Sequence, residues 1–161
     1  MATLEEQLKE IFTAKNLTLA TAESCTGGLL SARITDVSGS SAYFLGGVVS
    51  YANSAKEALL GVEHELLMTH GAVSAAVARQ MAHGARERLG ADVGISVTGI
   101  AGPTGGTPEK PVGLVWIGLS DAEGEQAARF QWAYDRAGNR EHSVEAALRM
   151  LIEWGKVATP R

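Results

Sequence analysis

The stretch Thr21–Leu30 reads TAESCTGGLL and combines the exit of a strand, a candidate nucleophile and the entry to a helix. The apolar run Leu17–Ala20 precedes it and predicts a buried strand, and the residues after it keep a helical spacing. We expect Thr26 to be the N-cap of that helix, with Gly27 and Gly28 opening its first turn. Such a turn leaves backbone N–H groups unpaired at the positive end of the helix dipole, which suits an anion or a developing oxyanion.

The composition predicts one globular domain over residues 1–161. The chain has 45% apolar residues and a formal net charge of −4, without a dense block of lysine or arginine. These features argue against a nucleic-acid surface, and they favour small molecules or copies of the chain itself as partners. The N-terminus is acidic and amphipathic, and no apolar run reaches membrane-spanning length. We therefore expect a cytoplasmic protein with no membrane partner.

Neither a metal nor a cofactor is predicted. A single cysteine, Cys25, excludes an intramolecular disulfide and any cysteine-rich metal site. The four histidines show none of the spacings that are typical of metal ligands.

The order of predicted elements indicates the fold class. We expect helices over residues 3–15, 54–60, 63–69 and 74–89 and from about residue 139 onward. Thr3 and Glu6 should form a capping box at the first of these helices, Asn53 should cap the second and Ser74 the fourth. Strands are expected over 17–20, 47–51, 92–97, 112–119 and 125–132. The third and fourth strands are joined without a helix and so should be antiparallel, and the fourth and fifth should form a hairpin. The result is an α/β fold, a three-layer α/β/α domain with a mixed, mostly parallel sheet of about five strands. The carboxyl ends of its parallel strands should gather the Ser24 turn, the turn from Tyr51 to Lys56 and the loop at Thr98.

Ser24 is the candidate nucleophile, because a strand-to-helix turn exposes a side chain in this way. A serine before a helix is also a common cap or turn residue, so this alternative stays open. Cys25 is a rival, since a helix N-terminus lowers the pKa of a thiol, although small cysteines are also common in cores.

Lys56 is the candidate general base for Ser24, provided that its pKa falls from about 10.4 towards neutrality. A helix end contributes only about 0.3–1 kcal/mol, so burial must supply the rest of that shift. Tyr51 could relay a proton or bind substrate, and otherwise it is a packed aromatic side chain.

Two further regions are candidates for substrate binding. The glycine-rich loop from Gly99 to Gly106 allows a close approach of backbone to ligand, although it lacks the spacing of a dinucleotide fold or a P-loop. Arg136 and Arg140 lie one helical turn apart and could clamp a phosphate, or they could form a solvated face.

Five ordered motifs together resemble the CinA C-terminal domain family, and the likeness runs from about Leu4 to Trp154. They are AESCTGG at 22–28, GVVSYAN at 47–53 followed by Lys56, HGAVS at 70–74, TGIAGP at 98–103 and KPVG at 110–113. One position departs from the family pattern, because Tyr134 precedes Asp135-Arg136 where a glycine is expected.

The resemblance implies a nicotinamide-nucleotide amidohydrolase of pyridine nucleotide salvage, in the stand-alone form. Its reaction converts nicotinamide mononucleotide and water to nicotinic acid mononucleotide and ammonia. The resemblance also implies a homodimer or a larger homo-oligomer. Many family members carry an N-terminal domain that resembles molybdopterin-binding proteins, and nothing in this sequence implies the activity attached to that domain.

The resemblance assigns roles residue by residue. Ser24 resembles the family's nucleophile, Lys56 its general base and Tyr51 a supporting catalytic residue. Arg136 and Arg140 match the arginines that the family places near the substrate phosphate. From the residues themselves we expect the N–H groups of Thr26, Gly27 and Gly28 to hold the oxyanion, with further substrate contacts from Thr98 and Gly99. A different class of function remains open, a module that binds a pyridine nucleotide without converting it.

Overall fold

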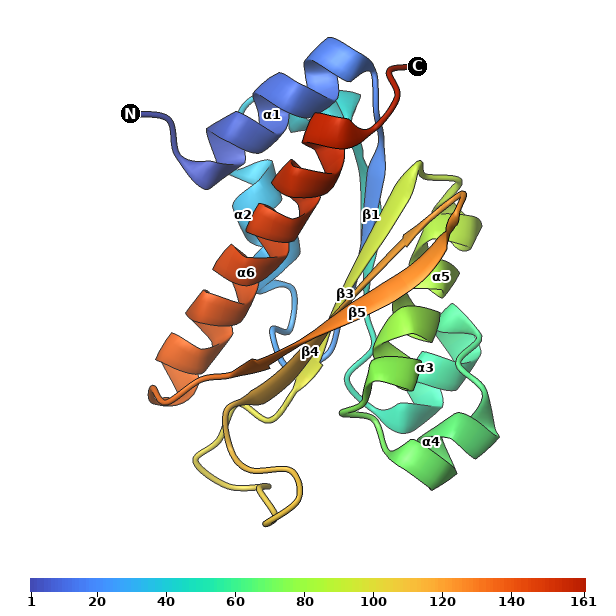
Figure 1. The fold of residues 1–161 in the computed structure, drawn as a ribbon, viewed down its shortest axis with the longest axis vertical. Helices are drawn as coiled ribbons and strands as arrows, with labels where there is room; N and C mark the ends of the chain where they lie inside the picture. The colour runs from blue at the N-terminus through green and yellow to red at the C-terminus, as the bar shows by residue number, and fades with distance from the viewer.

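A five-stranded mixed sheet forms the centre of the molecule, in a computed structural model that describes residues 1–161 (Figure 1). The strand order is β2-β1-β3-β4-β5. β1 pairs in parallel with both β2 and β3, whereas β4 is antiparallel to both of its neighbours. Only β4 therefore runs against the others, and the predicted mixed, mostly parallel sheet is confirmed. The strands are β1 (Leu19–Glu23), β2 (Phe44–Val49), β3 (Val93–Gly99), β4 (Leu114–Asp121) and β5 (Gly124–Gln131).

Helices cover the sheet on both faces, which gives the predicted three layers (Figure 1). Each face has its own apolar cluster, one between the sheet and α1, α2 and α6, and a smaller one beneath the other three helices. The helices are α1 (Leu4–Lys15), α2 (Leu29–Thr35), α6 (Arg136–Val157), α3 (Asn53–Leu60), α4 (His64–His70) and α5 (Ala75–Leu89), and a short 3₁₀ turn covers Ser40–Ala42.

Of the four predicted N-caps, those of α1 and α5 are confirmed. Thr3 and Glu6 form the expected capping box of α1, and Ser74 caps α5. The predicted start of α6 was wrong by three residues. The Asp135 side chain accepts a hydrogen bond from the Gly138 N–H at 2.8 Å, so the helix begins at Arg136 and carries both arginines on its first turns.

The strand boundaries differ from the predicted ones. β1 begins at Leu19 and continues to Glu23, so it takes in three residues that were assigned to the turn. β2 begins at Phe44 and ends at Val49, before Tyr51. The polar residues Thr21 and Glu23 obscured this pattern, although both are fully buried.

α5 lies unusually close to the sheet. A Cβ atom at Gly94 would overlap the Ala82 carbonyl oxygen, and one at Gly118 would overlap that of Ala78. The Ser96 hydroxyl donates to the same Ala78 oxygen at 2.6 Å. The absence of side chains at these two positions therefore sets the spacing between α5 and the strands that lead to the Thr98 loop.

No helix combines the length and the apolar character that crossing a bilayer requires. No group of three or more histidine, cysteine, aspartate or glutamate side chains is arranged to hold a metal ion.

Candidate active site

The carboxyl ends of the three parallel strands are hydrogen-bonded to one another beside Ser24. The Ser24 N–H donates to the Val97 carbonyl of β3 at 2.9 Å, and the Ser50 N–H donates to the Glu23 carbonyl of β1 at 2.8 Å. The convergence that the sequence predicted is present, and it places the Ser24 turn next to the segment that leads into α3.

Lys56 reaches this junction from α3 and lies against Ser24. Its Nζ is 2.9 Å from Ser24 Oγ, 2.8 Å from the Ser50 carbonyl oxygen and 3.1 Å from the Tyr51 carbonyl oxygen. The residue is 1% exposed, and none of the ion pairs in the molecule includes it. Lys56 is therefore a buried amine without a carboxylate partner.

This geometry suits both protonation states of Lys56. An ammonium group has three N–H donors, and three oxygens surround it. The neutral amine has two N–H donors for the two carbonyls, which leaves its lone pair facing the Ser24 hydroxyl. Burial lowers the pKa of Lys56 and so favours the neutral form. Burial is the contribution that we expected to be needed beyond the helix dipole. Ser24 and Lys56 thus have the arrangement of a nucleophile and its base.

Cys25 has the opposite character. It is 7% exposed, and burial raises the pKa of its thiol to about 12. Because the thiolate is the nucleophilic form, this raised pKa argues against Cys25 as the nucleophile.

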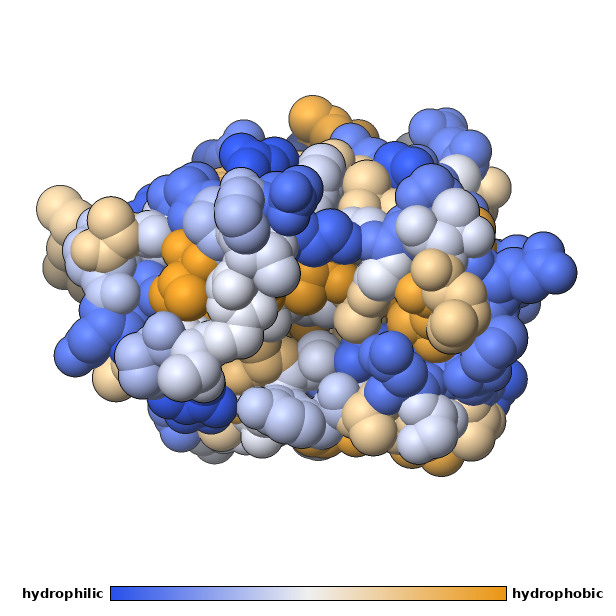
Figure 2. Space-filling model, turned by 90° about the horizontal axis from the view of Figure 1, so that it is seen from below, coloured by the Kyte–Doolittle hydropathy of each residue, from blue (hydrophilic) through white to orange (hydrophobic).

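A cavity of about 340 Å³ opens beside the Ser24–Lys56 pair. Figure 2 views the molecule from this end, where apolar surface lies recessed between polar side chains. Residues from all three converging segments line the cavity, among them Ser24, Lys56, Tyr51, Thr98, Gly99 and Arg136. Six of the predicted site residues therefore share one hollow.

Tyr51 and Arg136 meet at the rim of the cavity. Arg136 Nη2 donates to the Tyr51 hydroxyl at 3.3 Å, and Nη1 donates to the Gly102 carbonyl at 2.8 Å. The Tyr51 side chain is 62% exposed, and Tyr51 contacts Lys56 through its main-chain carbonyl. Tyr51 is thus placed to contact a ligand rather than to share the Ser24 proton.

Thr98 and Gly99 form part of the cavity wall at the end of β3. The Thr98 hydroxyl donates to the Ala72 carbonyl at 2.9 Å, which joins the strand end to the segment before α5. A Cβ at Gly99 would lie 2.6 Å from a Val115 side-chain carbon, so the wall requires glycine there.

The comparisons with known proteins match nearly the whole chain. The sequence profile of the CinA C-terminal domain family matches residues 1–154. The chain belongs to the CinA C-terminal domain family. A CinA-like protein of Salinibacter ruber is 58% identical over 146 residues, which are 91% of this chain and 35% of that protein. A CinA-like protein of Geobacter sulfurreducens is 52% identical over 149 residues, 92% of this chain and 36% of that protein. The chain therefore spans about a third of the length of the curated relatives it matches.

Solved structures of this family have the same fold. The competence/damage inducible protein CihA from Agrobacterium tumefaciens has a TM-score of 0.89 at 44% identity, over 95% of this chain and 98% of that one. A CinA superfamily protein from Klebsiella pneumoniae has a TM-score of 0.91 at 33% identity, over 95% and 96% of the two chains.

Four predicted substrate contacts of this CinA-family chain lie outside the cavity. Thr26, Gly27, Gly28 and Arg140 are absent from its lining. The prediction of Thr26 as an N-cap was wrong, because the Thr26 hydroxyl donates to Glu23 at 2.6 Å and Gly28, with φ 103°, takes the cap position. The Gly27 N–H is also committed, to the Ser24 carbonyl at 3.1 Å. The backbone N–H groups of Cys25, Thr26 and Gly28 have no hydrogen-bond partner, and the first two lie directly after the nucleophile.

Arg140 contacts the main chain of the turn. Its Nε donates to the Cys25 carbonyl at 3.1 Å and its Nη2 to the Thr26 carbonyl at 2.9 Å. Arg136 also makes two hydrogen bonds, but it lines the cavity and Arg140 does not, so the geometry favours Arg136 over Arg140 for a phosphate.

Glu23 was not predicted to belong to the site, and Asn53 was predicted to be an N-cap and not a cavity residue. Glu23 is fully buried at the end of β1, and its only sequence signal was a carboxylate directly before the candidate nucleophile. The prediction of Asn53 as the N-cap of α3 was wrong, because Ala52 is the N-cap and Asn53 is the first helical residue. Asn53 lines the cavity instead.

Proposed function

We propose that this chain hydrolyses the carboxamide of nicotinamide mononucleotide to nicotinic acid mononucleotide and ammonia, as a nicotinamide-nucleotide amidase in pyridine nucleotide salvage. The observation that carries the proposal is the position of the Lys56 amine, which is buried and has two carbonyl acceptors for its N–H groups and the Ser24 hydroxyl for its lone pair. The identity of the nucleotide comes from the resemblance to the family.

The proposed reaction is an acyl transfer in two steps. Ser24 Oγ attacks the carboxamide carbon while Lys56 takes its proton, and the same proton passes to the departing nitrogen, which leaves as ammonia. Water then attacks the resulting ester, Lys56 takes a proton from that water, and the proton returns to Ser24 Oγ as the acid is released. The N–H of Cys25, on the residue that follows the nucleophile, has no hydrogen-bond partner and is a candidate donor to the oxyanion.

The rim of the cavity supports binding of the nucleotide part. Arg136 is a charged side chain with the Tyr51 hydroxyl beside it, and an arginine fork suits a phosphate. We assign the phosphate to Arg136 and aromatic contact with the ligand to Tyr51. A homodimer or larger homo-oligomer is part of the proposal.

The test is ammonia release from nicotinamide mononucleotide, with mass-spectrometric identification of the acid product. The wild-type chain should turn the nucleotide over, Ser24→Ala should not, and Ser54→Ala is a matched control on an exposed serine of α3. Binding of the nucleotide without any acid product over hours would favour the non-catalytic binding module. Undiminished turnover by Ser24→Ala would contradict the nucleophile assignment.

A further inference from the structure

The Glu23 carboxylate lies beneath the turn that carries Ser24 and is completely enclosed. It accepts four hydrogen bonds, from the Thr26 hydroxyl at 2.6 Å, the Leu30 N–H at 2.8 Å, the Ser31 N–H at 3.0 Å and the Ser31 hydroxyl at 2.7 Å. Two of these donors are backbone groups at the start of α2, where the helix leaves N–H groups unpaired. The Glu23 side chain therefore caps the N-terminus of α2 and also holds the turn that connects β1 to α2.

The negative charge at the N-terminus of α2 thus belongs to the protein itself. A carboxylate in that position is favoured by the helix dipole, and it takes up the donors that an external anion would need. The Leu30 and Ser31 N–H groups are therefore not available to a substrate anion, although the sequence suggested an anion site at this helix start.

Arg140 also contacts this turn, but as a hydrogen-bond donor and not as an acceptor. Glu23 accepts from the hydroxyl of Thr26, whereas Arg140 donates to the carbonyls of Cys25 and Thr26. Each of these carbonyls shares a peptide unit with the N–H of the next residue, so Arg140 also fixes the orientation of the Thr26 N–H.

We propose that Glu23 and Arg140 are positioning residues, which together hold the turn Ser24–Thr26 so that Ser24 Oγ faces Lys56. This inference rests on the proposed function for its substrate. Neither residue lines the cavity, so both act on the reaction through the turn that they hold. The main chain adds to the effect, because the Glu23 carbonyl accepts from the N–H of Ser50, whose own carbonyl accepts from Lys56.

The experiment measures the reactivity of Ser24 directly, with a fluorophosphonate probe that modifies activated serines and with mass spectrometry of the labelled residue. Glu23→Gln replaces one acceptor oxygen by an N–H₂ group that faces the existing donors. We expect its labelling rate to fall by about 10- to 100-fold, the size of effect that a displacement of about 1 Å produces. In the amidase assay kcat should fall by a similar factor, while KM and the pH midpoint of the rising limb stay unchanged.

Arg140→Met separates positioning from substrate binding. If Arg140 is a positioning residue, its removal should lower kcat and the labelling rate and leave KM unchanged. A rise in KM with unchanged labelling would show that Arg140 binds the substrate phosphate, and it would overturn the inference for this residue.

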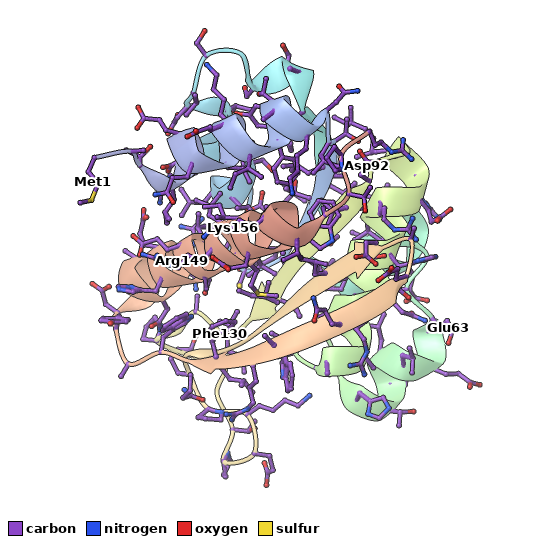
Figure 3. The ribbon with its side chains drawn as sticks, turned by 45° about the horizontal axis from the view of Figure 1, so that its top comes forward. Met1, Glu63, Asp92, Phe130, Arg149 and Lys156 are labelled. Carbon is purple, nitrogen blue, oxygen red and sulfur yellow. The ribbon has the colours of Figure 1, made fainter.

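Asp92→Asn is the matched control at the opposite end of β1 (Figure 3). The Asp92 carboxylate accepts from the N–H of Thr18 at 2.8 Å and from its hydroxyl at 3.1 Å, just before the strand begins. Its loss should lower stability without a change in Ser24 labelling. An equal fall in labelling in Asp92→Asn would show a general effect of stability and would overturn the proposal, as would wild-type labelling in Glu23→Gln.

A second pair of variants keeps the test decisive if Glu23→Gln does not fold. Thr26→Val removes one of the four hydrogen bonds at constant volume, and Thr26→Ser restores the hydroxyl. Labelling should fall in the first and recover in the second, and equal rates in both would contradict the proposal. If the wild-type chain labels at Ser24 but releases no ammonia, the proposed substrate fails while the positioning inference is still tested.

Discussion

The two principal hollows of the molecule differ in size and in content. The larger, about 670 Å³, lies between β5 and the C-terminal half of α6, where Figure 3 shows Phe130 on the strand and Arg149 on the helix. The candidate active site occupies about 340 Å³ at the carboxyl ends of the parallel strands. The larger hollow, which we call the α6 groove, has an aromatic floor in which Phe130 and Trp132 stack with ring centres 5.3 Å apart.

The difference shows that volume alone does not locate chemistry. The charged residues of the α6 groove, Glu145, Arg149 and Glu153, are half-buried or exposed. In the candidate active-site cavity a lysine is fully buried without a counter-ion, which costs stability, and an ionisable group buried at a cleft is typical of a functional site. The two hollows therefore differ in one chemical respect, because only the smaller one places a buried lysine against a serine hydroxyl.

The largest effect is expected from Lys56→Arg. A guanidinium stays protonated at all accessible pH values, so it cannot take the Ser24 proton. We expect kcat to fall by about 10²- to 10⁴-fold in the ammonia-release assay, the usual contribution of a general base. Lys9→Arg is the control, since Lys9 also donates to a carbonyl, that of Ser38, at the surface. Activity within a fewfold of wild type for Lys56→Arg would place the base elsewhere.

Arg136→Met should act on binding and leave the chemical step nearly intact. Loss of a charge-assisted contact with a phosphate should raise KM by about 10- to 100-fold. The exposed Arg79→Met on α5 is the matched control for the loss of one positive charge. An unchanged KM would move the phosphate away from Arg136.

The buried charge should also appear in the pH dependence of stability. Burial places the folded-state pKa of Lys56 below its usual value of 10.5, so between these two pKa values the folded chain binds fewer protons than the unfolded chain. The free energy of unfolding attributable to Lys56 therefore rises with pH inside that window, by about 1.4 kcal/mol per pH unit at most, and is flat outside it. Urea titrations should show this slope in the wild type and its loss in Lys56→Met. Identical pH profiles for the two chains would mean that the pKa of Lys56 is not lowered.

The smallest effect is expected in the α6 groove. Met150→Gln places an amide among its apolar residues and should lower the free energy of unfolding by about 1 kcal/mol, typical of a half-buried position. Its kcat and KM should stay within about twofold of wild type. A larger loss of activity at unchanged stability would show that the α6 groove contributes to the reaction and would contradict the distinction drawn between the two hollows.

Much of the sheet and of the site could be predicted from the sequence. The alternation of apolar strands and capped helices indicated the three layers, and the absence of a helix between β3 and β4 indicated their antiparallel pairing. Ser24 and Lys56 were both named because a hydroxyl at a strand-to-helix turn and a lysine early in a helix are chemically distinctive. Their contact at 2.9 Å spans 32 residues of chain and follows only from the parallel pairing of β1 with β2.

The errors arose where buried polar groups replace the usual signals. A threonine followed by two glycines is typical of a helix start, but the buried Glu23 takes the capping role from seven and eight residues upstream. Capping patterns use residues within a few positions of the helix start, so they cannot identify a capping side chain that lies on the preceding strand. For a related reason the sequence could not show that Arg140 donates to main-chain carbonyls, since such an arginine has the same sequence appearance as one that binds a phosphate.

The close approach of α5 to the sheet has a consequence for engineering this domain. Because the Ala78 and Ala82 carbonyls leave no space for a methyl group at Gly118 and Gly94, alanine at either position would have to lift the helix off the strands. The segment before α5 carries the Ala72 carbonyl that accepts from Thr98, so such a lift would be transmitted to the cavity wall. A library that varies the cavity lining can therefore be screened freely only while these two glycines are held fixed.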